Sequence, residues 1–89
     1  MSYKILFSKE ALKGLGLLAQ KKSLLKNASN IVEILKVDPY QNPPPFEKLL
    51  GDLTGCFSRR INIQHRLVYS VDESAKEVLI HSVWSHYEF

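Results

Sequence analysis

The spacing of apolar residues predicts one strand followed by two helices in the first half of the chain. Residues 3–7 form a short apolar run rich in β-favouring types, which predicts a strand. Apolar residues then recur at three- and four-residue spacing, which is typical of a helix; they are Ala11, Leu12, Leu15, Leu18 and Ala19. Ser8 is suited to cap that helix. The same spacing predicts a second helix from Leu24 to Leu35, which Asp38-Pro39 ends.

The second half alternates between apolar and polar residues with a period of two, which predicts three strands. They cover residues 56–63, 65–71 and 78–85, with a tight turn near residues 63–64 and a hairpin turn at residues 72–75. In the last strand, the alternation places His81 and Val83 on the same face. The expected fold class is therefore α+β, with an N-terminal strand, two helices and an antiparallel three-stranded meander in one domain of residues 1–89. We expect the helices to cover one sheet face and leave the other for a groove.

Glycine and proline interrupt this pattern at three places. Gly14 and Gly16 lie within the first predicted helix, and each weakens it by up to about 1 kcal/mol relative to Ala. Asn42 and three prolines form a rigid, extended stretch at residues 42–45, which we expect to aim the next segment. Gly51 and Gly55 interrupt the residues that follow this stretch.

Composition narrows the protein class. The chain has 89 residues, of which 45% are apolar and 24% charged, as in a compact globular domain. A domain this small buries only about 60–65% of its unfolded surface, so a partner could contribute to its stability. No apolar stretch approaches the roughly 18 residues of a membrane span, and the N-terminal apolar run is too short for a signal peptide. The single Cys56 cannot form an internal disulfide, so we expect a cytoplasmic protein without membrane contact.

Charge is unevenly distributed along the chain, although the net value is only +3. Residues 1–45 contain seven lysines against three acids, whereas residues 46–89 contain five basic residues against six acids. All three arginines lie between residues 59 and 66. Arg presents a planar fork of donors that matches a phosphate, whereas Lys presents a point charge.

The candidate chemistry lies in the second half. The His and Cys residues lack the paired spacing of zinc sites, and there is neither a glycine-rich phosphate loop nor a recognisable Ser or Cys nucleophile. An acid, Glu47, precedes the arginine-bearing strands, and His86-Tyr87 follow the last strand. An acid, an arginine and a histidine can cleave RNA without a metal or cofactor: a base removes the 2′-hydroxyl proton, an arginine stabilises the phosphorane, and an acid protonates the leaving oxygen. These residue types alone leave that function open.

Three strings carry a more specific signal. Residues 58–69 read SRRINIQHRLVY, residues 46–55 read FEKLLGDLTG, and residues 85–87 read SHY. Their order and spacing resemble the YoeB/Txe family of toxins from toxin–antitoxin systems, within the wider RelE-like fold. The resemblance is close over residues 46–87 and architectural over residues 1–45. It implies an endoribonuclease that inhibits translation by cleaving messenger RNA in the ribosomal A site.

The resemblance also implies roles for single residues. Glu47 matches the general base, Arg66 the arginine on the transition-state phosphate, His86 the general acid and Tyr87 an aromatic beside the site. Further positions near the RNA are implied, namely Lys48, Arg59, Arg60 and Trp84. Three features depart from the family pattern: Glu88-Phe89 extend the chain, Trp84 replaces a common basic residue, and Leu50 replaces a common lysine, with Lys48 close by. Trp84 is able to stack on a base or to pack in the core.

The resemblance implies partners too: the ribosome, a Phd/YefM-type antitoxin whose disordered C-terminal segment folds onto the toxin, operator DNA through that complex only, and a possible homodimer. Two other functions stay open, a ParE-like toxin of the same fold with a target other than RNA and a non-catalytic module that regulates its operon. The acid and base roles of Glu47 and His86 could be reversed.

We interpret His65 and His81 as hydrogen-bonded structural residues and Cys56 as a packed small residue. We expect lysines 21, 22 and 26 either to be solvated or to contact ribosomal RNA.

Overall fold

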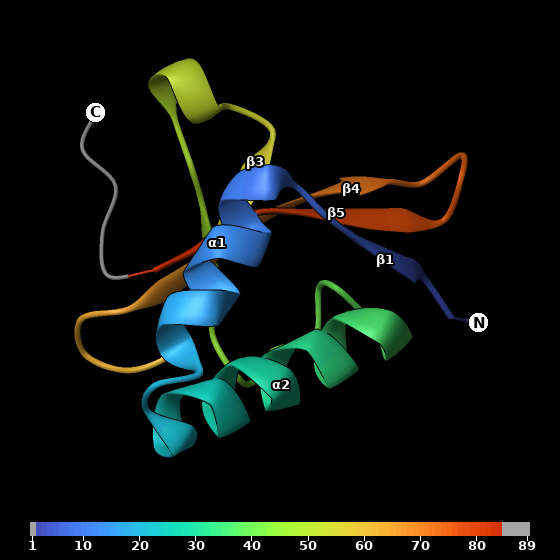
Figure 1. Cartoon of the computed structure of the whole chain (residues 1–89). Helices are drawn as coiled ribbons and strands as arrows, with labels where there is room; N and C mark the ends of the chain where they lie inside the picture. The colour runs from blue at the N-terminus through green and yellow to red at the C-terminus, as the bar shows by residue number, and fades with distance from the viewer. Residues whose placement is uncertain (1, 85–89) are drawn as a thin grey trace.

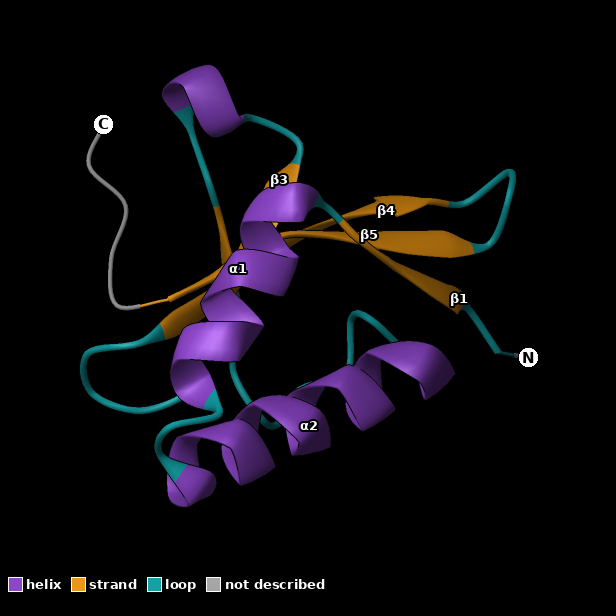
Figure 2. Cartoon of the chain, viewed as in Figure 1, coloured by secondary structure: helices purple, strands orange, loops and turns teal. Residues whose placement is uncertain are grey.

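Five strands form one mixed sheet, and both helices cover the same face of it (Figures 1 and 2). The computed structural model describes residues 2–84. The elements in chain order are β1 (Lys4–Phe7), α1 (Lys9–Leu18), α2 (Lys22–Val37), β2 (Glu47–Lys48), a 3-10 turn η1 (Gly51–Leu53), β3 (Cys56–Arg60), β4 (Arg66–Asp72) and β5 (Glu77–Trp84). The α+β class and the order of strand, two helices and meander are confirmed.

The helix ends follow the local chemistry of the sequence. Ser8 has extended backbone angles, and its side-chain oxygen accepts a hydrogen bond from the amide of Ala11 at 3.0 Å, as an N-cap should. The second helix runs to Val37, and Asp38 with its following proline ends it. Within residues 2–84, neither helix is long and apolar enough to cross a membrane.

The strand order is β1-β5-β4-β3-β2, with β1 parallel to β5 and every other pair antiparallel. Alternate residues of each strand face the helices and close a single core. Its fully buried members come from both helices and from the central strands: Ala11, Leu18, Ala28, Leu35, Leu67, Tyr69, Val78, Ile80 and Val83. The opposite face of the sheet, which we call the open face, carries no helix (Figure 2).

Three local features differ from the sequence prediction. Glu47 and Lys48 form a short fifth strand, β2, against β3, where no strand was predicted. The strand predicted over residues 56–63 ends at Arg60, because the chain then bends and His65 pairs back to Ile61. A β-bulge lets Tyr69 pair with Ile80 while Val68 pairs with Ser82, so His81 is the extra residue. The bulge moves Val83 onto the core face, and the prediction that it shares a face with His81 was wrong.

Candidate functional site

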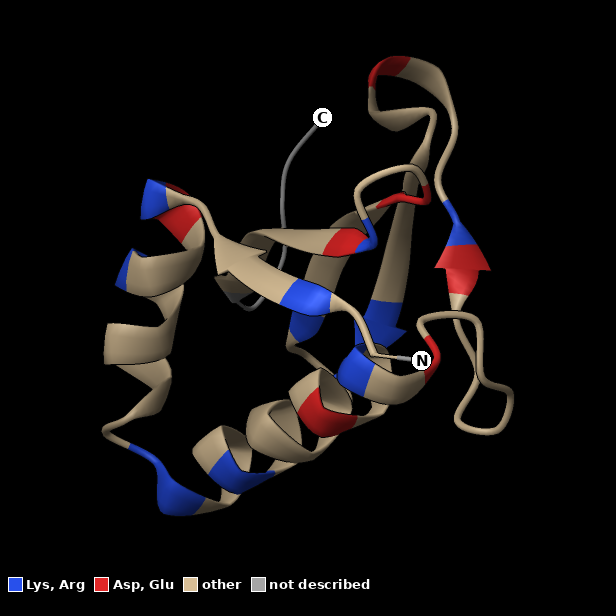
Figure 3. Cartoon of the chain, turned by 90° about the vertical axis from the view of Figure 1, so that its right-hand side faces the viewer, with Lys and Arg blue, Asp and Glu red and all other residues tan. Residues whose placement is uncertain are grey.

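The open face brings the predicted acid together with two of the three predicted arginines, Arg60 and Arg66. Register pairs define two neighbouring rows across the strands. One row contains Glu47, Ser58, Val68 and Ser82. The next row contains Arg60, Arg66 and Trp84. Because residues two apart on a strand share a face, these strand positions all belong to the open face, and the rows run across the sheet from the β2 edge to β5. In Figure 3 the two charges of β2 appear as neighbouring red and blue segments of a short arrow.

Glu47 and Arg66 form an exposed and loose ion pair. The distance between Arg66 Nη1 and Glu47 Oε1 is 3.5 Å, which is longer than the roughly 2.7–2.9 Å of a tight charge-assisted hydrogen bond. The Glu47 side chain is 65% exposed and that of Arg66 is 30% exposed. A pair of this kind contributes about 0–1 kcal/mol to stability. Both groups can therefore exchange their mutual contact for a substrate at little cost.

Arg60 adds a second cation beside this pair. It lies directly opposite Arg66 in the β3–β4 register and is exposed. Like charges directly opposite each other on neighbouring strands are unfavourable. An anion bound between them removes that repulsion, and the arginine fork suits the two oxygens of a phosphate.

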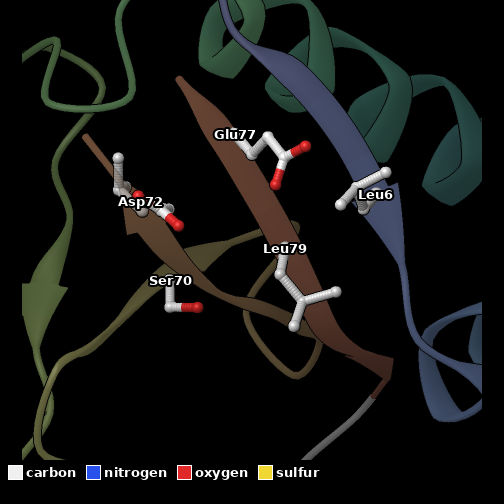
Figure 4. Close-up of a pocket in the computed structure, with 6 residues that line it drawn as sticks. Leu6, Ser70, Asp72, Glu77 and Leu79 are labelled. Atoms are coloured by element: carbon white, nitrogen blue, oxygen red, sulfur yellow. The ribbon is translucent and has the colours of Figure 1, made fainter. Parts of the chain in front are cut away.

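The far end of the open face has the opposite charge. Figure 4 shows Leu6 and Leu79 over the sheet, with Asp72 and Glu77 at one end of the same pocket. Asp72 and Glu77 lie opposite each other in the β4–β5 register, and Lys4 pairs with Glu77 on the other side. The open face is thus cationic near Arg60 and Arg66 and acidic at the opposite end, which limits a phosphate site to the arginine end.

Arg59 does not lie with these residues, and the expectation that it contacts RNA is corrected. Its register partner is Leu67 on the core face, and Arg59 is only 1% exposed. Four of its five N–H donors are occupied, by the Tyr69 hydroxyl and by the carbonyls of Pro39, Gln41 and Pro44. A side chain buried and bonded in this way has no surface or donor fork left for a phosphate.

The other predicted positions divide into three cases. Lys48 pairs with Phe57 and so lies on the face opposite Glu47, although it is exposed at the sheet edge. Trp84 ends β5 in register with Arg66. His86 and Tyr87 lie outside the described residues, as does the Glu88-Phe89 extension, so their roles stay predictions.

Two polar residues on the open face were not predicted as part of a site. Ser58 pairs with Glu47 in the register, and its Oγ is buried without a hydrogen-bond partner in residues 2–84. Its place in the SRR string was the available signal. His81 bonds Ser70 through Nε2 and Oγ at 2.8 Å, and burial lowers the pKa of its imidazole. The alternation along β5 already places His81 on the face opposite the buried Val78 and Ile80, and only the residues after the bulge change face. His65 is 4% exposed and contacts Asn62, in line with a structural role.

Comparison with known proteins gives the family. Residues 7–87 match the family described as the YoeB-like toxin of bacterial type II toxin–antitoxin systems. The chain belongs to this family. The Toxin YoeB of Synechocystis sp. is 37% identical over 67 residues, which cover 75% of this chain and 76% of that protein.

Solved structures of YoeB proteins have the same fold as this chain. YoeB in the YoeB–YefM complex from Staphylococcus aureus is 32% identical, with a TM-score of 0.81 and coverage of 98% of this chain and 100% of that one. The YoeB dimer from the same organism is also 32% identical, with a TM-score of 0.77 and the same coverage. The predicted family is therefore confirmed, and this chain is a YoeB-like toxin of a type II toxin–antitoxin system.

Proposed function

We propose that this YoeB-like toxin is a metal-independent, ribosome-dependent endoribonuclease that cleaves messenger RNA. The observation that carries the proposal is the Glu47–Arg66 pair, with a carboxylate and a guanidinium 3.5 Å apart and accessible on the open face. A general base and a phosphate-binding cation at this separation are what in-line attack by a ribose 2′-hydroxyl needs.

The reaction balances with residues of this chain alone. Glu47 accepts the proton of the 2′-hydroxyl, whose oxygen attacks the adjacent phosphorus. Arg66 donates hydrogen bonds to the phosphorane oxygens as negative charge develops there. His86 is proposed to protonate the leaving 5′-oxygen, and Tyr87 to shape the site beside it. The products are a 2′,3′-cyclic phosphate, which can open to a 3′-phosphate, and a 5′-hydroxyl.

RNA contacts are proposed at the same end of the open face. Arg60 is exposed beside Arg66 and suits a neighbouring phosphate. Trp84 is proposed to stack on a base, since its strand position is in register with Arg66. Lys48 contributes at most long-range attraction from the sheet edge, because it lies on the opposite face from Glu47. The net charge of +3 is small for an RNA-binding protein, which favours a reaction in which the ribosome holds the message.

An antitoxin of the Phd/YefM type is the proposed inhibitor. The S. aureus relative is a YoeB–YefM complex, and acidic side chains of a disordered segment would pair with the exposed arginines of this chain. We propose that the bound segment covers or rearranges Glu47, Arg66 and His86, that operator DNA is bound only through the complex, and that the toxin can form a homodimer. A complex structure in which all three residues stay open and unshifted would contradict the first of these proposals.

Mapping of messenger RNA ends tests the nuclease function. Translating ribosomes are incubated with the wild type, with Glu47→Gln and with Arg66→Lys. New 5′-hydroxyl ends should appear with the wild type, and the rate should fall by about 10²–10⁴ for Glu47→Gln and about 10²–10³ for Arg66→Lys. Glu77→Gln is the matched control, because it removes a carboxylate from the acidic end of the same face, and its rate should stay within about twofold.

Two results would overturn this function. Intact message together with inhibited DNA supercoiling would point to a ParE-like toxin. Growth arrest that survives His86→Ala undiminished would point to a non-catalytic module.

A further inference from the structure

Arg59 is the most deeply buried cation among the described residues, and its partners are concentrated in one segment. Nε donates to the Tyr69 hydroxyl at 3.1 Å. Nη1 donates to the carbonyl of Pro44 at 2.7 Å, and Nη2 donates to the carbonyls of Pro39 at 3.0 Å and Gln41 at 2.9 Å. Arg59 makes no ion pair within residues 2–84. Its charge is therefore stabilised by backbone carbonyls and aromatic rings.

Those carbonyls all belong to residues 39–46, which we call the connector. The connector contains no helix or strand and joins α2 to β2. A segment without regular structure lacks the repeating backbone hydrogen bonds that fix a helix or strand. Tyr69 adds a further bond, because its hydroxyl donates to the Pro39 carbonyl at 2.7 Å. Arg59 and Tyr69 thus anchor the connector to β3 and β4 at three carbonyls.

The anchor extends to the residue before Glu47. The Arg59 Cζ lies 4.9 Å from the centre of the Phe46 ring, and that ring packs edge-on against Phe57 with centroids 5.7 Å apart. Glu47 then begins β2, a strand of only two residues at the sheet edge. So short an edge strand has few ladder bonds of its own, with one more from the Leu49 amide to the Cys56 carbonyl at 3.0 Å, and the anchored connector constrains it from the other end.

We propose that Arg59 is a positioning residue for Glu47. It fixes the connector and Phe46 on the core face, and through the backbone it holds the Glu47 carboxylate beside Arg66 on the open face. This inference rests on the proposed nuclease function for its catalytic consequence. Arg59 itself does not touch RNA, since its side chain points into the core while Glu47 and Arg66 lie on the other side of the sheet.

The test compares two anchor variants with one control. Arg59→Lys keeps the charge but loses the planar fork, so it cannot bond three carbonyls and the Tyr69 hydroxyl at once. Tyr69→Phe is milder, because it removes only the hydroxyl shared by Arg59 and Pro39, and it serves as the second variant should Arg59→Lys fail to fold. Val78→Ala is the control: it shortens a fully buried side chain of β5, whereas the connector is bonded to Arg59 on β3 and Tyr69 on β4, so it lowers stability without touching the anchor.

Three readouts are made on each purified variant: amide hydrogen exchange of a peptide spanning residues 40–48, the kcat and KM of ribosome-dependent cleavage, and the salt dependence of RNA binding. For Arg59→Lys we expect connector exchange to rise at least tenfold and kcat to fall at least tenfold, with KM and the salt slope unchanged. Tyr69→Phe should change exchange and kcat in the same directions by a few fold. Val78→Ala should leave connector exchange and kcat within about twofold.

Each of the following alternative outcomes would refute one part of the proposal. If Arg59 contacted RNA, KM would rise and the slope of log K against log salt would weaken by about 0.7 with connector exchange unchanged. If connector exchange rose while kcat did not change, Arg59 would be an anchor only and the positioning role would be refuted. A wild type that cleaves no RNA would overturn the proposed function instead, and exchange would then still decide whether Arg59 holds the connector.

Discussion

Two glycines of α1 provide a matched test of how closely that helix packs on the sheet. Gly14 is buried against β5, and a Cβ built there would overlap the Val83 carbonyl oxygen and lie 2.9 Å from its carbonyl carbon. Gly16 is exposed, and a Cβ there meets nothing within 4 Å. The substitution to Ala is the same at both sites, and so is its gain in helix propensity.

The two effects have opposite signs. Gly16→Ala should stabilise the protein by about 0.5–1 kcal/mol, because Ala loses less backbone entropy in a helix. Gly14→Ala receives the same gain but has to displace backbone of β5, and overpacking of this kind costs about 1–3 kcal/mol. A change of 1 kcal/mol moves the Tm of a domain of this size by about 4–8 °C. The Tm of Gly14→Ala should therefore lie at least about 4 °C below that of Gly16→Ala.

Thermal and urea unfolding followed by circular dichroism measure both variants against the wild type. The two-state comparison is valid if the urea m-value is the same for all three proteins. Equal stability of Gly14→Ala and Gly16→Ala would show that α1 does not approach β5 as closely as the structure has it. Gly14→Ala more stable than the wild type would refute the close approach outright.

Two further predictions concern stability. Ser8→Ala should lower the free energy of unfolding by about 1 kcal/mol, because it removes the N-cap bond to Ala11, and Ser8→Thr should recover most of it in the same urea assay. Burial lowers the pKa of His65 and of His81, so the unfolded chain binds more protons and the stability should fall as the pH drops below about 6.5 toward the lowered values. The urea midpoint between pH 7.5 and 5.5 measures this, and His81→Gln should reduce the dependence; an unchanged midpoint in the wild type would refute it.

The helices and the meander could be predicted because their stabilising contacts are local and periodic. Leu24, Ala28, Ile31 and Leu35 recur at helical spacing, and all four are buried in the core. The Ser8 cap was predicted for the same reason, since an N-cap depends only on the residue before a helix and the first turn. The same pattern predicts that one face of the sheet carries no helix, because both helices pack on the other face.

Features set by long-range contacts could not be predicted in this way. A strand of two residues, such as β2, has no period, and it exists because Glu47 meets Ser58 across the sheet. The bulge at His81 depends on how β4 and β5 are aligned, and a single extra residue reverses the face of everything after it. The carbonyls that bond Arg59 belong to residues 15 to 20 positions away, and nothing in the local pattern of β3 indicates them.

Side chains alternate between the two faces of β3, so its two adjacent arginines have different roles. Arg60 faces the open side, where its charge stays exposed and available to an anion. Arg59 faces the core, where burial is tolerable only because four donors find acceptors at once. The guanidinium group meets both needs, since the same planar fork that fits phosphate oxygens also fits several backbone carbonyls. One arginine of this pair therefore holds the connector on the core face, and its neighbour supplies positive charge to the site on the open face. Residue type alone does not distinguish these two roles, because both residues are arginine.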